Sequence, residues 1–229
     1  MTRQLPITVD GEENQLLALR CHDGERLAVW QNSRYRWLER NGILQSAVDR
    51  RYPQRPLLPH QHSLLCAAQA GGLRIERVLE LGLGGGTTLN YLSQHHLLSR
   101  YTLIERSSNV IQLFRDHFAR DHHHQILEGD AADLLPLQPQ DHDLLIIDIG
   151  IDLGLPPLLR EPELWPTAMA RLRPGGRLVV NLLPADQGEL DRLLSLFYRT
   201  TGLIPQLEGV KGYANVILSA TRSSDASPP

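Results

Sequence analysis

The sequence predicts an α/β protein with a doubly wound, mostly parallel sheet and a small antiparallel β unit in front of it. From Arg77 onward, short apolar runs alternate with amphipathic segments, which is typical of strands joined by helices in a parallel sheet. Two of these runs, LLIID at 144–148 and LVVNLL at 178–183, are almost continuously apolar. Strands that are buried on both faces of a parallel sheet have this composition.

The N-terminal unit is predicted from short strand-like runs that alternate with turn signals. The runs LLALRC, RLAVWQ, RYRWLER and ILQSAV are separated by Asp23-Gly24, Asn32-Ser33 and Asn41-Gly42. Asn-Gly between two such runs is a strong hairpin signal, because both residues tolerate the positive φ angles of a tight turn. We therefore expect an antiparallel β unit over residues 1–55.

The rest of the chain is predicted as one larger unit over residues 56–220, followed by a polar, disordered tail over residues 221–229. After a proline-rich connector, the pattern predicts a helix at 62–71. The expected strands lie at 77–82, 101–105, 124–130, 142–150, 176–183, 203–210 and 213–220. The expected helices lie at 87–96, 108–119, 160–172 and 187–200, with a short apolar segment at 131–137.

Composition excludes several classes of function. The 229 residues are enough for one sizeable core, and the formal net charge of −3 argues against a nucleic-acid partner. No run reaches the length of a membrane span, and the first residues lack the apolar core of a signal peptide, so we expect a cytoplasmic protein with no membrane partner. Cys21 and Cys66 stand alone, and no metal-ligand spacing is present, so no metal is expected.

A glycine-rich loop is the first candidate for binding a ligand. In an open α/β sheet the ligand lies at the carboxyl ends of the strands, and ELGLGGG follows the first strand of the larger unit. Glycines let the backbone turn tightly and approach a nucleotide at a helix N-terminus. The predicted binding residues are Glu80, Gly82, Gly84, Gly85 and Gly86. Thr87 stands where a dinucleotide-binding loop would have its third glycine, which disfavours a nicotinamide-dependent oxidoreductase but leaves it as an alternative.

Acidic residues follow the next two strands. Glu105 ends the second strand, 23 residues after Gly82, where a carboxylate can accept both hydroxyls of a ribose. Asp130, followed by the small Ala131, ends the third strand. It is predicted either to accept from an adenine amino group or to cap the short segment behind it.

Asp148 is the best candidate for a reacting or amine-binding group. It follows four apolar residues of a strand that would deliver it into the cleft, and a carboxylate there is costly unless it is paired or near water. Asp152 lies four residues further on in a Gly/Pro-rich loop, where it is predicted to be either a second catalytic acid or a turn residue.

These motifs together resemble the spermidine synthase family, the polyamine aminopropyltransferases. The resemblance rests on Asn41-Gly42-Ile43-Leu44-Gln45 for the family's dGxxQ signature, on the glycine loop, on Glu105, on Gly129–Ala131 and on LRPGGRLVVNL. It is strongest to divergent bacterial members. It implies a Rossmann-like class I methyltransferase fold and a role in polyamine biosynthesis. The implied co-substrate is S-adenosylmethionine or its decarboxylated form, without a metal.

The resemblance also implies a small-molecule amine as acceptor, contacts from Gln45 and His60 to the substrate, and a homodimer. Three motifs depart from the family pattern. Gly85 and Ile151 replace aspartates, and His60-Gln61-His62 replaces Tyr-His-Glu. Polyamines are cationic and need carboxylates along their path, so these losses leave two other functions open. They are methyl transfer from S-adenosylmethionine to a small molecule and a catalytically silent nucleoside-binding protein.

Overall fold

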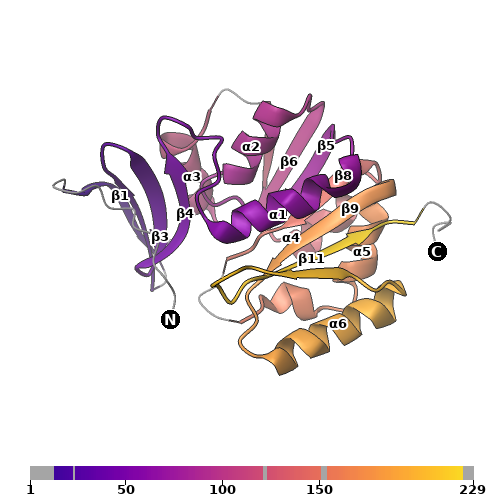
Figure 1. Cartoon of the computed structure of the whole chain (residues 1–229). Helices are drawn as coiled ribbons and strands as arrows, with labels where there is room; N and C mark the ends of the chain where they lie inside the picture. The colour runs from indigo at the N-terminus through magenta and orange to yellow at the C-terminus, as the bar shows by residue number, and fades with distance from the viewer. Residues whose placement is uncertain (1–12, 23, 121–122, 151–153, 224–229) are drawn as a thin grey trace.

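The computed structural model describes residues 13–22, 24–120, 123–150 and 154–223. They form two sheets, a four-stranded antiparallel sheet and a seven-stranded mostly parallel sheet with helices on both faces (Figure 1). The predicted fold class is therefore confirmed. Within the described residues, no helix is long and apolar enough to cross a membrane.

The N-terminal sheet contains the first four strands in sequential order. They are β1 Gln15–His22, β2 Glu25–Gln31, β3 Tyr35–Arg40 and β4 Ile43–Asp49. The predicted Asn-Gly hairpin joins β3 to β4, with φ of 52° at Asn41 and 79° at Gly42. The Asn41 side chain also accepts from the Arg26 amide, which ties this turn to β2.

The large sheet has the strand order β10-β11-β9-β8-β5-β6-β7. Its strands are β5 Arg77–Leu81, β6 Arg100–Glu105, β7 Gln125–Glu128, β8 His142–Ile147, β9 Leu172–Leu182, β10 Gln206–Gly209 and β11 Val216–Thr221. Strands β5 to β9 run parallel, whereas β10 and β11 form an antiparallel hairpin at one edge. All six residues of β8 are buried, as its apolar run predicts.

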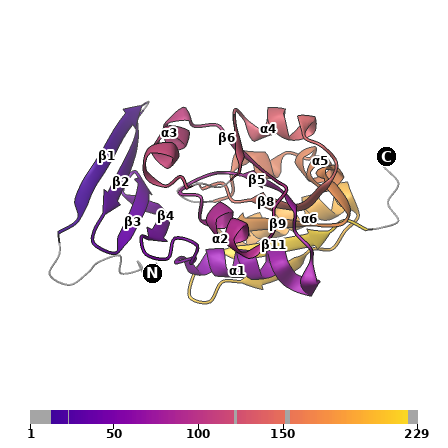
Figure 2. The ribbon, with the colours of Figure 1, turned by 90° about the horizontal axis from the view of Figure 1, so that it is seen from above.

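Helices pack on both faces of this sheet (Figure 2). They are α1 Pro59–Gln69, α2 Thr87–His95, α3 Ser108–His117, α4 Ala131–Leu134, α5 Leu164–Arg171 and α6 Gln187–Thr201. Residues of α1, α2 and α3 share one apolar core with the N-terminal sheet, whereas those of α5 and α6 share a second core on the other face. The N-terminal sheet thus packs on the side of α2 and α3 and is not a separate body.

Some element boundaries differ from the expected ones. The helix expected at 160–172 begins at Leu164, after a 3₁₀ turn at Pro157–Arg160, and β9 begins as early as Leu172. Extra pairing explains the early start of β9, because Leu172 lies opposite His142 of β8 before the chain bulges. Thr221, expected in the tail, belongs to β11, and residues 224–229 lie outside the described part.

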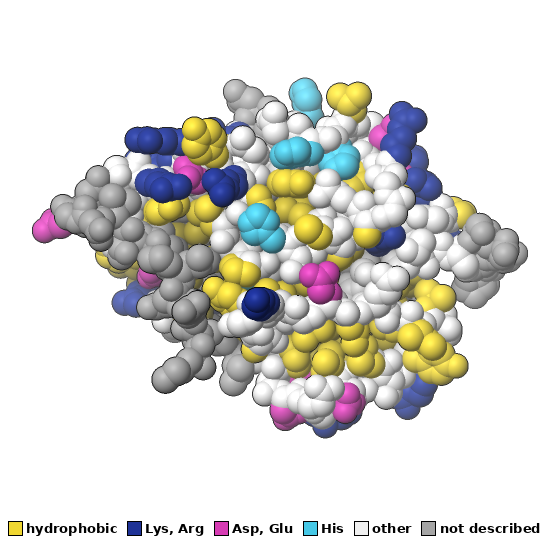
Figure 3. Space-filling view, viewed as in Figure 1, with side chains coloured by type: hydrophobic (Ala, Val, Ile, Leu, Met, Phe, Trp, Pro, Cys, Tyr) yellow, Lys and Arg dark blue, Asp and Glu magenta, His cyan; other side chains and the backbone are white. Residues whose placement is uncertain are grey.

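Exposed apolar side chains gather over α6 and β10. Leu194 and Tyr198 of α6 lie with Ile204, Pro205 and Leu207 around a shallow hollow. Figure 3 shows apolar side chains grouped in this part of the surface.

Candidate active site

The predicted site residues converge at the carboxyl ends of three adjacent parallel strands. Gly82 follows β5, Glu105 ends β6 and Asp148 follows β8, and β5 pairs with both neighbours. The N-terminal sheet reaches the same edge, because the Arg40 guanidinium donates to the Gly150 carbonyl at 3.0 Å. The site therefore lies where the two sheets meet.

Asp148 is held by an amide relay that the sequence analysis did not identify. Asn181 on β9 donates from Nδ2 to Oδ1 of Asp148 at 2.8 Å, and Asn215 donates in turn to Oδ1 of Asn181 at 3.0 Å. The position of Asn181 inside the apolar run LVVNLL could have indicated such a contact, because a buried polar side chain needs a hydrogen-bond partner. The relay fixes one carboxylate oxygen and leaves the other for a further contact.

His60 lies in the first turn of α1, close enough to Asp148 for their charges to interact. Burial lowers the pKa of the His60 imidazole below its usual 6.5, and the Asp148 carboxylate partly opposes this shift. His60 is therefore neutral at neutral pH and is able to accept a proton. Its neighbour His62 is exposed, so only the first histidine of His60-Gln61-His62 turns toward Asp148.

Glu105 anchors the glycine loop to the start of α3. Its Oε2 accepts from the Leu83 amide at 3.2 Å, and its Oε1 accepts from the Ser107 amide at 2.8 Å. Burial raises the pKa of this carboxyl, while the two amides and the nearby Arg40 pull it down. Each oxygen keeps one lone-pair direction, which fits the predicted contact with two ribose hydroxyls.

Two glycines of the loop are required by protein packing. A Cβ on Gly82 would lie 2.2 Å from the Asp148 carbonyl oxygen, so β5 and β8 approach each other here as only glycine permits. A Cβ on Gly86 would lie 2.4 Å from the Phe114 ring of α3. Both also have positive φ angles, 98° at Gly82 and 66° at Gly86.

Gly85, the position of an aspartate in the family pattern, is closed off by the N-terminal sheet. A Cβ there would lie 2.6 Å from Oγ of Ser46 on β4 and 3.2 Å from the Phe118 ring. At Gly84 the nearest atom to such a Cβ is the Ser46 Cβ at 3.6 Å, an ordinary contact. Ser46 and Phe118 therefore occupy the space that an aspartate side chain at position 85 would need.

The start of α2 keeps unpaired donors beside this loop. Among the described residues, the backbone amides of Gly84 and Gly85 have no hydrogen-bond acceptor, and the buried Oγ1 of Thr87 has no partner. Free amides at a helix N-terminus suit an anionic group such as a carboxylate. These donors therefore mark a place for an anionic group beside the glycine loop.

Glu80 lies beneath the loop. Its side chain is 4% exposed and accepts from the Tyr101 hydroxyl of β6. Burial raises the pKa of Glu80 to about 8, with a further upward contribution from Asp148. The structure therefore places Glu80 as a mostly protonated support for the loop at neutral pH.

The remaining predicted residues have different surroundings. Asp130 caps α4, where its carboxylate accepts from the Ala132 amide at 2.9 Å. One carboxylate can serve both roles, so its contact with an adenine amino group stays a prediction. Ala131 is the first residue of that helix. Oε1 of Gln45 lies 2.6 Å from the position of a Cβ on Gly150, which places Gln45 against the loop after β8. Asp152 lies outside the described residues.

The described residues contain no group of three or more histidine, cysteine or acidic side chains arranged to hold a metal ion. The donor set around Asp148 consists of carboxylates, amides and one imidazole. It suits the binding of an organic cation and proton transfer.

The fold and the position of these residues define a protein of the methyltransferase-fold class. The model of the family described as "Methyltransferase domain" matches residues 79–180. Human methyltransferase-like protein 13, solved in complex with SAH, superposes with a TM-score of 0.61 over 72% of this chain and 82% of its own, at 21% identity.

Within that class, the chain is similar to the polyamine aminopropyltransferases. It is 25% identical over 131 residues to a probable polyamine aminopropyl transferase of Bifidobacterium longum, and 28% identical over 112 residues to polyamine aminopropyltransferase 2 of Pseudomonas aeruginosa. These matches cover 56% and 45% of this chain. They span only 29% and 32% of the relatives, about a third of their length.

Solved spermidine synthases share the fold of most of this chain. A probable spermidine synthase of Corynebacterium glutamicum superposes with a TM-score of 0.74 over 92% of this chain and 83% of its own, at 18% identity. A spermidine synthase in complex with the transition-state analogue AdoDATO gives a TM-score of 0.70 over 92% and 73%, at 16% identity. The predicted resemblance is confirmed, and the low identities mark this chain as divergent.

Proposed function

We propose that the protein is a spermidine synthase-like transferase that binds S-adenosylmethionine or its decarboxylated form and transfers a group to a small amine. The observation that carries this proposal is Asp148. It stands at the carboxyl end of β8, oriented by Asn181 and beside the neutral imidazole of His60. The AdoDATO and SAH complexes of the structural neighbours support an S-adenosyl ligand in this fold.

The nucleoside would lie against the glycine loop, with its ribose at Glu105. The free amides of Gly84 and Gly85 would face its amino-acid end. A sulfonium ligand supplies an electrophilic carbon next to a positively charged sulfur. The chain must then supply a neutral nucleophile, because an ammonium has no lone pair to attack with. Asp148 attracts the amine and orients it, and His60 accepts the proton that the amine loses. The amine nitrogen then bonds to the electrophilic carbon while the carbon–sulfur bond breaks, and the sulfur leaves as a neutral thioether.

Aminopropyl transfer is the reaction that the similarity to named aminopropyltransferases favours. The acceptor would be a small amine with fewer charges than a polyamine has, because Gly85 and Ile151 provide no carboxylates for further ammonium groups.

Gly85 gives a specific reason to keep a second candidate, methyl transfer from S-adenosylmethionine. A neutral helix N-terminus suits the carboxylate that only the non-decarboxylated ligand carries.

The test is calorimetry on the full chain with S-adenosylmethionine, decarboxylated S-adenosylmethionine and methylthioadenosine. The proposal expects saturable binding of at least one of them. Preference for the decarboxylated form supports aminopropyl transfer, and preference for S-adenosylmethionine supports methyl transfer. If none binds, the nucleoside site is refuted.

Turnover separates an enzyme from a silent binding protein. With the preferred ligand and a panel of small amines, Asp148→Asn is expected to lower kcat by about 100-fold or more, since it removes the charge that holds the acceptor. Asp191→Asn, at an exposed carboxylate on α6, is the matched control and should leave kcat unchanged. Nucleoside binding without turnover of any amine in the wild-type protein would favour the silent nucleoside-binding alternative.

A further inference from the structure

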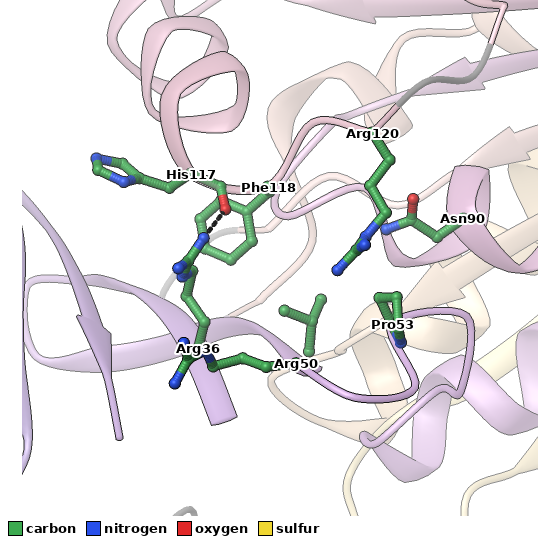
Figure 4. Close-up of a pocket in the computed structure, with 8 residues that line it drawn as sticks. Arg36, Arg50, Pro53, Asn90, His117, Phe118 and Arg120 are labelled. Carbon is green, nitrogen blue, oxygen red and sulfur yellow. Dashed lines mark hydrogen bonds between the residues drawn. The ribbon is translucent and has the colours of Figure 1, made fainter. Parts of the chain in front are cut away.

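Three arginines enclose a cavity outside the candidate active site. Arg36 on β3, Arg50 after β4 and Arg120 after α3 line a space of about 110 Å³ (Figure 4). It lies between the N-terminal sheet and the helices α2 and α3. Arg120 reaches into it from the α3 side, and Arg36 stands on the opposite side.

The three guanidinium groups have no acidic partner among the residues that the structure describes. Arg36 bonds to the Gln31 side chain at 2.7 Å and to the His117 carbonyl, and Arg50 bonds to the Asn32 carbonyl at 2.7 Å. All these acceptors are neutral.

The like charges act on one another. Burial lowers the pKa of the Arg36 guanidinium, and the charges of Arg50 and Arg120 lower it further. The nearest acid on α3, Asp116, is bonded to Gln112 at 3.1 Å on the exposed side of the helix. An anion between the three arginines would relieve this repulsion.

A buried amide adds a neutral donor to the same space. Asn90 of α2 is 3% exposed, and its side chain has no hydrogen-bond partner among the described residues. The Asn90 amide points toward the cavity in Figure 4. Val48, Pro53 and Phe118 form apolar walls.

We propose that this cavity, lined by Arg36, Arg50 and Arg120 with Asn90, binds a small tetrahedral oxyanion, either inorganic phosphate or the phosphate group of a small metabolite. A space of about 110 Å³ is sufficient to hold one such group. Guanidinium groups suit this ligand, because their N–H pairs match two oxygens of a phosphate. None of these residues belongs to the proposed transferase site, so each proposal stands without the other.

The test is calorimetric titration of the full chain with inorganic phosphate, methyl phosphate and acetate at constant ionic strength. Phosphate is expected to bind at one saturable site, and acetate at least tenfold more weakly. Binding of methyl phosphate as well as inorganic phosphate identifies a metabolite phosphate as the natural source, and binding of inorganic phosphate alone identifies the free ion. No saturable binding of either phosphate overturns the proposal.

Two variants at exposed positions locate the site. Arg120→Gln and Arg50→Gln are each expected to weaken phosphate binding at least tenfold while circular dichroism shows a folded protein. Arg199→Gln removes the same charge from the exposed end of α6 and should bind phosphate like the wild type. Wild-type affinity in both cavity variants, or an equal loss in Arg199→Gln, overturns the assignment.

Discussion

At the scale of single residues, the chemistry of the site depends on how neighbours tune one imidazole. His60 is buried, which lowers its pKa, and Asp148 is the group that raises it. Asp148→Asn is therefore expected to lower the pKa of His60 further, since the uncharged amide no longer stabilises the imidazolium. Titration of the His60 ring signals by NMR in both proteins measures the change.

An unchanged or raised His60 pKa in Asp148→Asn would mean that the two side chains do not interact.

The same pair predicts the direction of a pH profile. Because the imidazole must be neutral to accept a proton, activity should rise as the pH increases through the pKa of His60. In wild-type protein this limb should lie below the usual histidine range.

Gly85 offers a second test at this scale, because its missing side chain is explained by packing. Gly85→Ala places a methyl group 2.6 Å from Oγ of Ser46, so it should destabilise the protein by about 1–3 kcal/mol, the usual effect of overpacking. Ser46→Ala removes that oxygen. The double variant should therefore be more stable than the sum of the single effects predicts, apart from the residual contact with Phe118 at 3.2 Å.

Urea denaturation of the wild type, the two single variants and the double variant measures this coupling. Strictly additive free energies of unfolding would contradict the contact between β4 and the glycine loop. Gly24→Ala cannot serve as a matched control, because its φ of 78° makes the substitution strained by itself. Gly209→Ala, where a Cβ meets nothing within 4 Å, is the suitable one.

At the scale of elements, strands β5 and β6 carry a buried acid that couples stability to pH. Glu80 of β5 has its pKa raised to about 8 from 4.5, mainly by burial, and bonds to Tyr101 of β6. A group with a raised folded-state pKa contributes stability that is complete below pH 4.5 and is lost as the pH rises through about 8. The wild type should lose on the order of a few kcal/mol over this range through Glu80.

Glu80→Gln keeps the shape and the acceptor for Tyr101 but cannot ionise. Its free energy of unfolding should match that of the wild type near pH 5 and exceed it increasingly up to pH 8. Urea denaturation at several pH values measures the difference. Parallel curves for the two proteins would show that Glu80 is already ionised in the folded state.

The elements also show what sequence patterns predict well. The Asn41-Gly42 hairpin, the apolar run of β8 and the glycine loop were all predictable, because turn chemistry and burial act over a few residues. Asn181 was missed although its polar side chain interrupts an apolar strand. Its role depends on Asp148, 33 residues away, which pairs with it only in the folded sheet.

At the scale of the whole molecule, the contacts between the N-terminal sheet and the large sheet could not be predicted from the sequence. Ser46 against Gly85, Arg40 against Gly150, and the arginines of the cavity all join segments that lie far apart along the chain. Periodicity fixes which face of a strand is buried and says nothing about which other element covers it. The acidic residues of the candidate site could be predicted, because they stand at the ends of predicted strands. Their hydrogen-bond partners could not, because tertiary packing brings them together.

These contacts place the N-terminal sheet beside the proposed nucleoside site. Arg40 of β3 donates to the Gly150 carbonyl at 3.0 Å, and its charge lowers the pKa of Glu105. A nucleoside bound at Glu105 should therefore stabilise both the glycine loop and the β3–β4 hairpin. Hydrogen exchange of the wild type with methylthioadenosine should show slower exchange in both segments.

Arg40→Gln should separate the two effects. Without the guanidinium, the ligand still contacts the loop and slows its exchange, but the link to the β3–β4 hairpin is weakened, so protection there should fall by about tenfold. Arg26→Gln, on the neighbouring strand, changes the same charge without a contact to Gly150 and should behave like the wild type. Equal protection of the hairpin in Arg40→Gln would show that β3 and β4 respond to the ligand by another route, such as Gln45 against Gly150 or Ser46 against Gly85.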